Sequence, residues 1–147
     1  MRAINTSLRR AVGNNSQSDG FLGSLPINMT RRNLLHVQRS TYHLTEKSDG
    51  VRYLLYVVDD NAVKTKTAKT ATDATTGVAP VAVMQDRGKA AYRVSGGRAL
   101  GEALGHGTVL DGELVFNRNL QDYVFLVFDV LAIDGSPVLQ LPFSQVD

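Results

Sequence analysis

The 147-residue sequence contains no cysteine and only three histidines. Without cysteine there is no disulfide framework, no thiol nucleophile and no thiolate metal site, and an intracellular setting fits this composition. His36, His43 and His106 are scattered and lack the spacing of metal ligands. The longest apolar run, around residues 124–133, is half as long as a membrane helix and contains Asp129. It therefore predicts a buried strand, and no membrane span is predicted.

The net charge is also small. Sixteen basic and fourteen acidic residues give a formal charge of +2. This value does not indicate nucleic-acid binding by itself, although it is compatible with local basic clusters that contact phosphate. The hydrophobic and charged fractions, 43% and 20%, are those of a soluble globular protein, and the length suits one domain or part of one.

Two stretches have little to bury. Residues 1–20 carry a Gly-Asn-Asn-Ser-Gln-Ser-Asp-Gly run and no acid before Asp19, which predicts disorder or a linker, with a mitochondrial transit peptide as the alternative. Residues 61–80 form an Ala/Thr/Lys tract without aromatic side chains, which predicts a flexible surface insertion between two strands. The predicted domain therefore covers residues 21–147 and contains this insertion.

The remaining segments predict short helices and apolar strands. Thr30 is expected to cap a helix that ends near residue 39, with Leu34, Leu35 and Val37 facing inward. Strands are predicted over residues 42–47, 51–58, 81–87, 90–94 and 122–133, with a hairpin turn at 87–89 and a short helix over 98–104. Residues 108–116 are interpreted as two strand segments joined by a turn at Asp111-Gly112.

The most informative stretch is Lys47-Ser48-Asp49-Gly50-Val51-Arg52. Asp-Gly is typical of a tight turn and the flanks are typical of strands, so Lys47 is predicted to be held in a turn between two strands, as a nucleophilic amine would be. The alternative is a hairpin with an ordinary surface lysine, because such a tetrapeptide also occurs by chance. Arg52 is expected to pair with a buried carboxylate, to bind substrate oxygens, or to do both.

Two carboxylates and one aromatic ring stand out in the later strands. Glu113 begins a buried strand segment and needs a partner, for which Lys47 or Arg52 would serve. By strand alternation Phe128 and Asp129 are expected on opposite faces of the sheet. Phe128 is either a core residue or a stacking surface. Asp129 is expected to be hydrogen-bonded, paired with a cation or linked to a metal.

Three blocks in this order resemble the nucleotidyltransferase motifs shared by mRNA capping guanylyltransferases and ATP-dependent DNA and RNA ligases. They are residues 47–52, 110–115 and 125–131. The segments 21–27, 31–34 and 84–87 are similar to stretches of the capping enzymes in particular. The resemblance covers about residues 21–143. It implies an α+β nucleotidyltransferase domain that is rich in antiparallel sheet and has short flanking helices. The implied domain is of the ligase type, which is similar to ATP-grasp domains.

The resemblance also implies roles for individual residues. Lys47 would attack the α-phosphate of GTP, expel pyrophosphate and hold GMP before its transfer to the 5′ diphosphate end of RNA. Arg52 and Arg87 would contact ribose or phosphate oxygens and favour the neutral amine that attacks. Phe128 would stack on guanine. Glu113 would position the nucleotide.

A divalent ion, Mg²⁺ or Mn²⁺, is the implied cofactor, with Glu113 and Asp129 as its candidate ligands. The implied partners are the 5′ end of RNA, an RNA triphosphatase and RNA polymerase II, and no membrane is implied. The implied location is the nucleus, with the cytoplasm and the mitochondrion as alternatives.

Several family features are missing after Phe128: a carboxylate on a later strand, a Lys-x-Lys strand that contacts the α-phosphate, and an OB-fold domain. These features form much of the electrostatic clamp on which phosphoryl transfer depends. The chain is therefore expected to be an N-terminal fragment of the catalytic domain with little or no activity by itself.

Three other interpretations remain open at this stage. A polynucleotide ligase would load AMP from ATP on the same lysine. A non-catalytic module would bind nucleotide or RNA without transferring anything. An unrelated α/β domain would carry the Lys-x-Asp-Gly tetrapeptide by chance.

Overall fold

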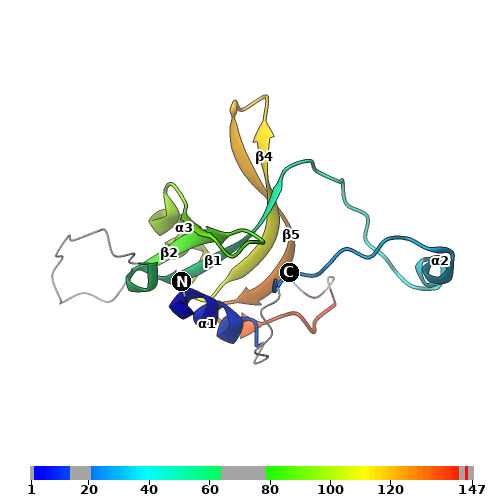
Figure 1. Ribbon diagram of the computed structural model, residues 1–147, viewed down its shortest axis with the longest axis horizontal. Helices are drawn as coiled ribbons and strands as arrows, with labels where there is room; N and C mark the ends of the chain where they lie inside the picture. The colour runs from blue at the N-terminus through cyan, green and yellow to red at the C-terminus, as the bar shows by residue number, and fades with distance from the viewer. Residues whose placement is uncertain (1, 14–20, 64–78, 143–144, 146–147) are drawn as a thin grey trace.

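The computed structural model describes residues 2–13, 21–63, 79–142 and 145. Its elements are helices α1 (Arg2–Ala11), α2 (Arg31–Arg39) and α3 (Gly97–Leu104), the 3-10 helix η1 (Asp60–Val63), and strands β1 (Val51–Asp59), β2 (Pro80–Gln85), β3 (Ala91–Arg93), β4 (Val109–Asn117), β5 (Asp122–Ile133) and β6 (Ser136–Pro137). The strands form one antiparallel six-stranded sheet in the order β3-β2-β1-β4-β5-β6 (Figure 1). The predicted α+β class is confirmed.

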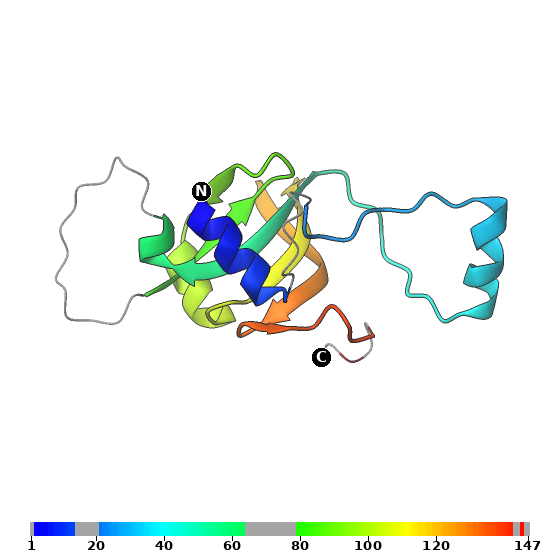
Figure 2. The ribbon, with the colours of Figure 1, turned by 60° about the horizontal axis from the view of Figure 1, so that its bottom comes forward.

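Strand β1 is apolar at nearly every position because both of its faces are covered. Leu54 and Tyr56 pack on one face against α1, which crosses the sheet in Figure 2. Leu55 and Val57 pack on the other face, together with side chains of α3. The core thus lies on both sides of the central strand, and the predicted strand over 51–58 is confirmed.

The prediction of a linker over residues 1–20 is wrong for its first part. Residues 2–11 form α1, and the side chains of Leu8 and Val12 are buried in the core. The polar composition concealed this helix, because a short amphipathic helix needs few apolar anchors when a sheet receives them. Gly13, at a φ of +67°, follows the helix in the left-handed conformation that glycine adopts readily. Residues 14–20 lie outside the described part of the chain.

Helix α2 forms where the sequence predicts it, but its packing differs. The backbone N–H of Thr30 donates a 2.6 Å hydrogen bond to the side chain of Asn33, closing the first turn. Leu34, Leu35 and Val37, predicted to face inward, are all exposed. Figures 1 and 2 show the reason: α2 stands away from the sheet at the end of two extended connections.

The second of these connections contains the predicted strand over residues 42–47, which does not form. Residues 41–49 are extended but pair with no described strand. Apolar residues promote a strand only where a neighbour supplies hydrogen-bond partners, and none of the described strands pairs with this segment. Lys47 is therefore not in a turn between two strands.

The predicted hairpin turn at 87–89 and the predicted short helix over 98–104 are confirmed. Strands β2 and β3 form a hairpin around residues 86–90. Helix α3 ends at Leu104 and is capped by Gly105, whose φ of +80° suits glycine. The predicted insertion over 61–80 begins with η1, and residues 64–78 lie outside the described part of the chain. No helix among the described residues is long and apolar enough to cross a membrane.

Strand β4 corrects another prediction. It runs without interruption from Val109 to Asn117, so Asp111-Gly112 is not a turn. Gly112 serves close packing, because a Cβ atom there would lie 2.6 Å from the Leu126 carbonyl oxygen and 2.6 Å from the ring of Phe125. β5 forms over the predicted residues 122–133. Together β4 and β5 make the long hairpin that rises from the sheet in Figure 1.

Candidate functional site

A groove of about 480 Å³ lies where the start of β1, the middle of β4 and the β2–β3 turn meet. Its lining residues are Gly50, Val51, Arg52, Asp86, Arg87, Gly88 and Glu113. Arg52 and Glu113 face each other directly across the β1–β4 pair, and Arg87 comes from the turn after β2. Three residues predicted from separate parts of the chain thus line one groove. A second cavity of about 280 Å³, beneath α1, contains none of the predicted site residues.

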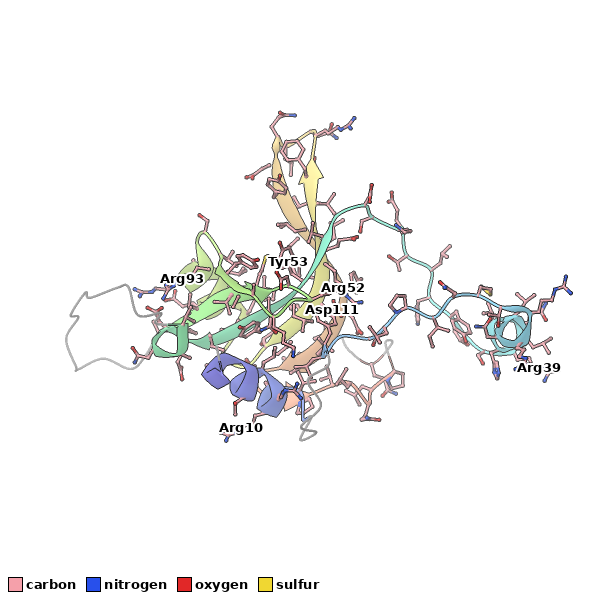
Figure 3. All side chains as sticks on the ribbon, in the orientation of Figure 1. Arg10, Arg39, Arg52, Tyr53, Arg93 and Asp111 are labelled. Carbon is pink, nitrogen blue, oxygen red and sulfur yellow. The ribbon has the colours of Figure 1, made fainter. Side chains whose placement is uncertain are left out.

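Arg52 is anchored to a carboxylate that the sequence-based site did not include. Its Nε and Nη2 atoms lie 2.8 and 2.5 Å from the two oxygens of Asp111, side by side in Figure 3. The Asp111 side chain is fully buried, and 13% of the Arg52 side chain is exposed. The hydrogen bonds to Asp111 raise the pKa of Arg52 despite the opposing effect of burial. Arg52 is therefore the partner of a buried carboxylate, one of its two predicted roles.

Arg52 also binds the segment that precedes α2. Nη2 donates a 2.7 Å hydrogen bond to the Ser24 carbonyl oxygen, and the guanidinium carbon lies 5.0 Å from the Phe21 ring centroid. Gly23 is buried here, and a Cβ atom on it would overlap with the Asp111 carboxylate. The chain therefore passes directly over the ion pair, and Arg52 joins this segment to β1 and β4.

Glu113 has a different partner from those predicted. It accepts a hydrogen bond from the hydroxyl of Ser48, not one from Lys47. The carboxylate also adds to the electrostatic stabilisation of the Arg52 cation opposite it. The Ser48–Glu113 bond ties the segment before β1 to β4, at the residue next to Lys47.

Lys47 lies beside the groove without lining it. Its side chain is exposed, and Nζ lies 3.5 Å from the Ser48 carbonyl oxygen. The fixed residue is Ser48, so Lys47 is held through its neighbour and not by a hairpin. Lys47 thus precedes the groove residues of β1 by only a few positions in the sequence, but its amine lies on the surface.

The end of β5 departs from strict alternation. Asp111 pairs with Asp129 and Gly112 pairs with Val127, so Phe128 is an extra residue without a partner on β4. Such a bulge turns two successive side chains toward one face. The predicted placement of Phe128 and Asp129 on opposite faces is therefore wrong. The Phe128 ring centroid lies 5.3 Å from the Arg52 guanidinium carbon, and Asp129 lies on the same face as Asp111.

Asp129 is half-buried and accepts a 2.9 Å hydrogen bond from the N–H of Val130. Burial is the main cause that raises its pKa, and the nearby charge of Asp111 adds to it, whereas Val130 and Arg52 act in the opposite direction. Within the described residues no group of three or more acidic or histidine side chains could hold a metal ion. Glu113 lines the groove and Asp129 does not, so the two predicted metal ligands are not brought together there.

Asp111 is the site residue that sequence reasoning missed. It was assigned to a turn because glycine follows it. The usable signal was its position among apolar residues of a strand, since a buried carboxylate in a strand requires a cation. Arg52, in the preceding block, was the available cation.

Comparison with known proteins identifies the family of the chain. The family model described as the mRNA capping enzyme catalytic domain matches residues 1–146. The mRNA-capping enzyme subunit alpha of Neurospora crassa is 31% identical over 152 residues, which cover 94% of this chain and 34% of that protein. The subunits of the same name in Schizosaccharomyces pombe and Saccharomyces cerevisiae are 29% and 32% identical, over 92% and 85% of this chain and 32% and 28% of the relatives.

The chain thus spans about a third of the length of these curated relatives. The match extends through all three motif blocks and through the α1 segment. The sequence therefore belongs to the mRNA capping enzyme family, within its catalytic domain.

Proposed function

We propose that this chain carries the lysine and part of the nucleotide site of an RNA guanylyltransferase. The observation that carries the proposal is the groove, because it gathers Arg52, Arg87 and Glu113 beside the segment that holds Lys47. These residues come from distant parts of the sequence, and a chance tetrapeptide would not assemble them.

The proposed reaction has two steps. In the first, Lys47 Nζ forms a bond to the α-phosphorus of GTP while the bond to the bridging oxygen of the β-phosphate breaks, so pyrophosphate leaves and the amine loses a proton. In the second, a terminal oxygen of a 5′ diphosphate RNA end attacks the same phosphorus. The phosphorus–nitrogen bond breaks, GMP passes to the RNA, and the lysine regains a proton.

The groove residues would act mainly by charge and position. Arg87 is exposed, and its side chain makes no recorded ion pair with another described residue, so it is available to phosphate oxygens. Arg52 is already bound to Asp111 and Ser24, so we assign to it the alignment of the groove and of Phe128. Glu113, fixed by Ser48, would accept hydrogen bonds from ribose hydroxyls.

Phe128 presents a partly exposed ring on which a guanine base could stack. A Mg²⁺ or Mn²⁺ ion bound with the triphosphate would supply neutralisation of phosphate charge. Magnesium sites commonly use one or two carboxylates plus substrate phosphates, so Glu113 alone fits such a site. We assign Asp129 a weaker part, because its raised pKa reflects an environment that disfavours the charged form.

The names of the relatives suggest the partners of this chain. These relatives are named as alpha subunits, a name that implies a further subunit. We propose that an RNA triphosphatase takes this place, since guanylyl transfer needs a 5′ diphosphate RNA end. RNA polymerase II is a further proposed partner, and the nucleus is the proposed location.

The experiment uses the product of the complete gene and, beside it, this 147-residue chain. Each is incubated with GTP or ATP labelled at the α-phosphate and with Mg²⁺, and covalent label is detected after denaturation. The complete product should take label from GTP, and the 147-residue chain should take little. Lys47→Ala and Lys47→Arg should abolish the label, whereas Lys64→Ala, which lies outside the motif blocks, should retain it.

Three results would contradict the proposal. Label from ATP alone would indicate a ligase-type adenylyltransferase. Label that survives Lys47→Arg would move the nucleophile to another residue. Binding of GTP without any covalent label in the complete product would indicate a non-catalytic nucleotide-binding module.

A further inference from the structure

The turn between β2 and β3 is organised by one side chain, that of Asp86. The Lys89 N–H donates to the Asp86 carbonyl oxygen at 3.0 Å and closes the turn. The Asp86 side chain accepts a 2.9 Å hydrogen bond from the Ala90 N–H at Oδ1 and a 2.9 Å hydrogen bond from the Tyr92 hydroxyl at Oδ2. Both carboxylate oxygens are therefore used within the hairpin.

This turn forms one wall of the groove. Asp86, Arg87 and Gly88 face Gly50, Arg52 and Glu113 across it. Arg87 has no recorded side-chain hydrogen bond or ion pair with another described residue, so the backbone of the turn alone determines where its guanidinium group can reach. Lys89 adopts a φ of +68°, an uncommon conformation for a residue with a side chain, so this backbone needs support.

We propose that Tyr92, through its hydrogen bond to Asp86, is a positioning residue that holds Arg87 where it meets a nucleotide phosphate. The inference rests on the proposed function, because the nucleotide supplies the phosphate. Tyr92 does not line the groove, and both carboxylate oxygens of Asp86 are already bound within the hairpin. They act by limiting the motion of the turn, so that less conformational entropy is lost when Arg87 binds an anion.

Two features make Tyr92 suited to this task. Its ring contacts the ring of Tyr53 on β1 edge to face, with centroids 6.0 Å apart, which orients the hydroxyl. A tyrosine hydroxyl is protonated throughout the neutral range, so it can donate to Asp86 there. The hydrogen bond to Asp86 is the main cause that raises the pKa of Tyr92 further. The contact thus links the turn to the central strand of the sheet.

The decisive variant is Tyr92→Phe, which removes the hydroxyl and keeps the ring against Tyr53. The matched control is Tyr123→Phe on β5, whose ring contacts Phe116 and whose hydroxyl lies far along the chain from the turn. The ligand is the α,β-methylene analogue of GTP, which cannot release pyrophosphate, and affinity is measured by calorimetry on the complete gene product. Tyr92→Phe should weaken binding about threefold, and Tyr123→Phe should leave it unchanged.

A merely structural role is separated by a double-mutant cycle with Arg87→Ala. If Tyr92 acts through Arg87, the Tyr92→Phe change should have no further effect once Arg87 is gone. As a readout independent of ligand, hydrogen exchange of the Ala90 amide should become about threefold faster in Tyr92→Phe, because the acceptor on Asp86 loses its support. Unchanged exchange at Ala90, or additive effects of the two substitutions on affinity, would overturn the inference.

The two proposals fail in different ways. If the wild type takes covalent label from GTP but the cycle is additive, the positioning role is wrong and the guanylyltransferase assignment stands. If the cycle shows coupling but the wild type takes no label, Tyr92 positions Arg87 in a binding site that does not transfer GMP.

Discussion

The ion pair between Arg52 and Asp111 predicts a large and specific loss of stability in Asp111→Asn. The Asp111 side chain is fully buried, and Arg52 is bound to both of its oxygens. An asparagine keeps the size of the side chain but removes its charge and one acceptor. The mostly buried arginine then loses the carboxylate that is bound to it and keeps only the weaker electrostatic support of Asp129 and Glu113. Such a state costs more than the pair itself contributes.

The magnitude can be estimated from the surroundings. Removing one partner of a buried pair costs about 3–5 kcal/mol. Arg52 keeps the Ser24 carbonyl oxygen and is 13% exposed, which places the expected loss at the lower end, about 3 kcal/mol. For a chain of this size each kcal/mol lowers the midpoint by about 2–4 °C, so Tm should fall by about 6–12 °C.

The assay is thermal and urea unfolding followed by circular dichroism. Arg98→Ala, which breaks an exposed arginine–carboxylate pair with Asp60 at 3.2 Å, is the matched control and should cost less than about 1 kcal/mol. The double variant Arg52→Met with Asp111→Leu should regain most of the stability, since it removes both charges of the buried pair. If Asp111→Asn costs no more than Arg98→Ala, burial does not govern this pair and the reasoning is refuted.

Two further predictions concern stability. Leu8→Ala should cost about 2–5 kcal/mol in urea unfolding, because Leu8 is 2% exposed and packs against the sheet; a cost near zero would mean that α1 does not contribute to the core. Burial alone would raise the pKa of Asp60, but the hydrogen bonds and charges of Arg93 and Arg98 outweigh it and lower the pKa. The stabilisation that ionised Asp60 contributes is therefore fully present at pH values above its ordinary pKa of 3.8. It is lost as the pH falls through the lower pKa of the folded state. Asp60→Asn should be less stable than the wild type at pH 7 by up to about 1 kcal/mol and indistinguishable from it in strong acid.

Local sequence signals predicted much of the sheet. Strands β1 and β5 are long apolar runs that hydrophobicity alone identifies, and the Arg87-Gly88-Lys89 sequence indicates the turn between β2 and β3. The segment over 42–47 shows the limit of this reasoning. Its composition suits a strand, but a strand exists only beside a partner, and the position of a partner is not a local property.

The site shows the same division. Glu113, Arg52 and Arg87 were predicted individually from the chemistry of buried charges and from the resemblance, and the groove contains all three. Asp111 was missed because the next residue is a glycine. In the sequence alone, Asp-Gly indicates a turn, whereas in the fold Gly112 allows close packing against the ring of Phe125. Local patterns cannot distinguish these two uses of glycine.

The sequence by itself determined the order of the motif blocks and the family that they resemble, because these depend on residue types and their spacing along one dimension. The resemblance in turn implied the antiparallel class that the sheet confirms. Only the tertiary structure decided three features of the site. Asp111 forms the ion pair with Arg52, Ser48 donates a hydrogen bond to Glu113, and a bulge turns Phe128 and Asp129 to one face. The physical reason is that pairing, register and burial arise between segments distant in sequence. A one-residue shift in the β4–β5 register changes which side chains meet, although every residue stays the same.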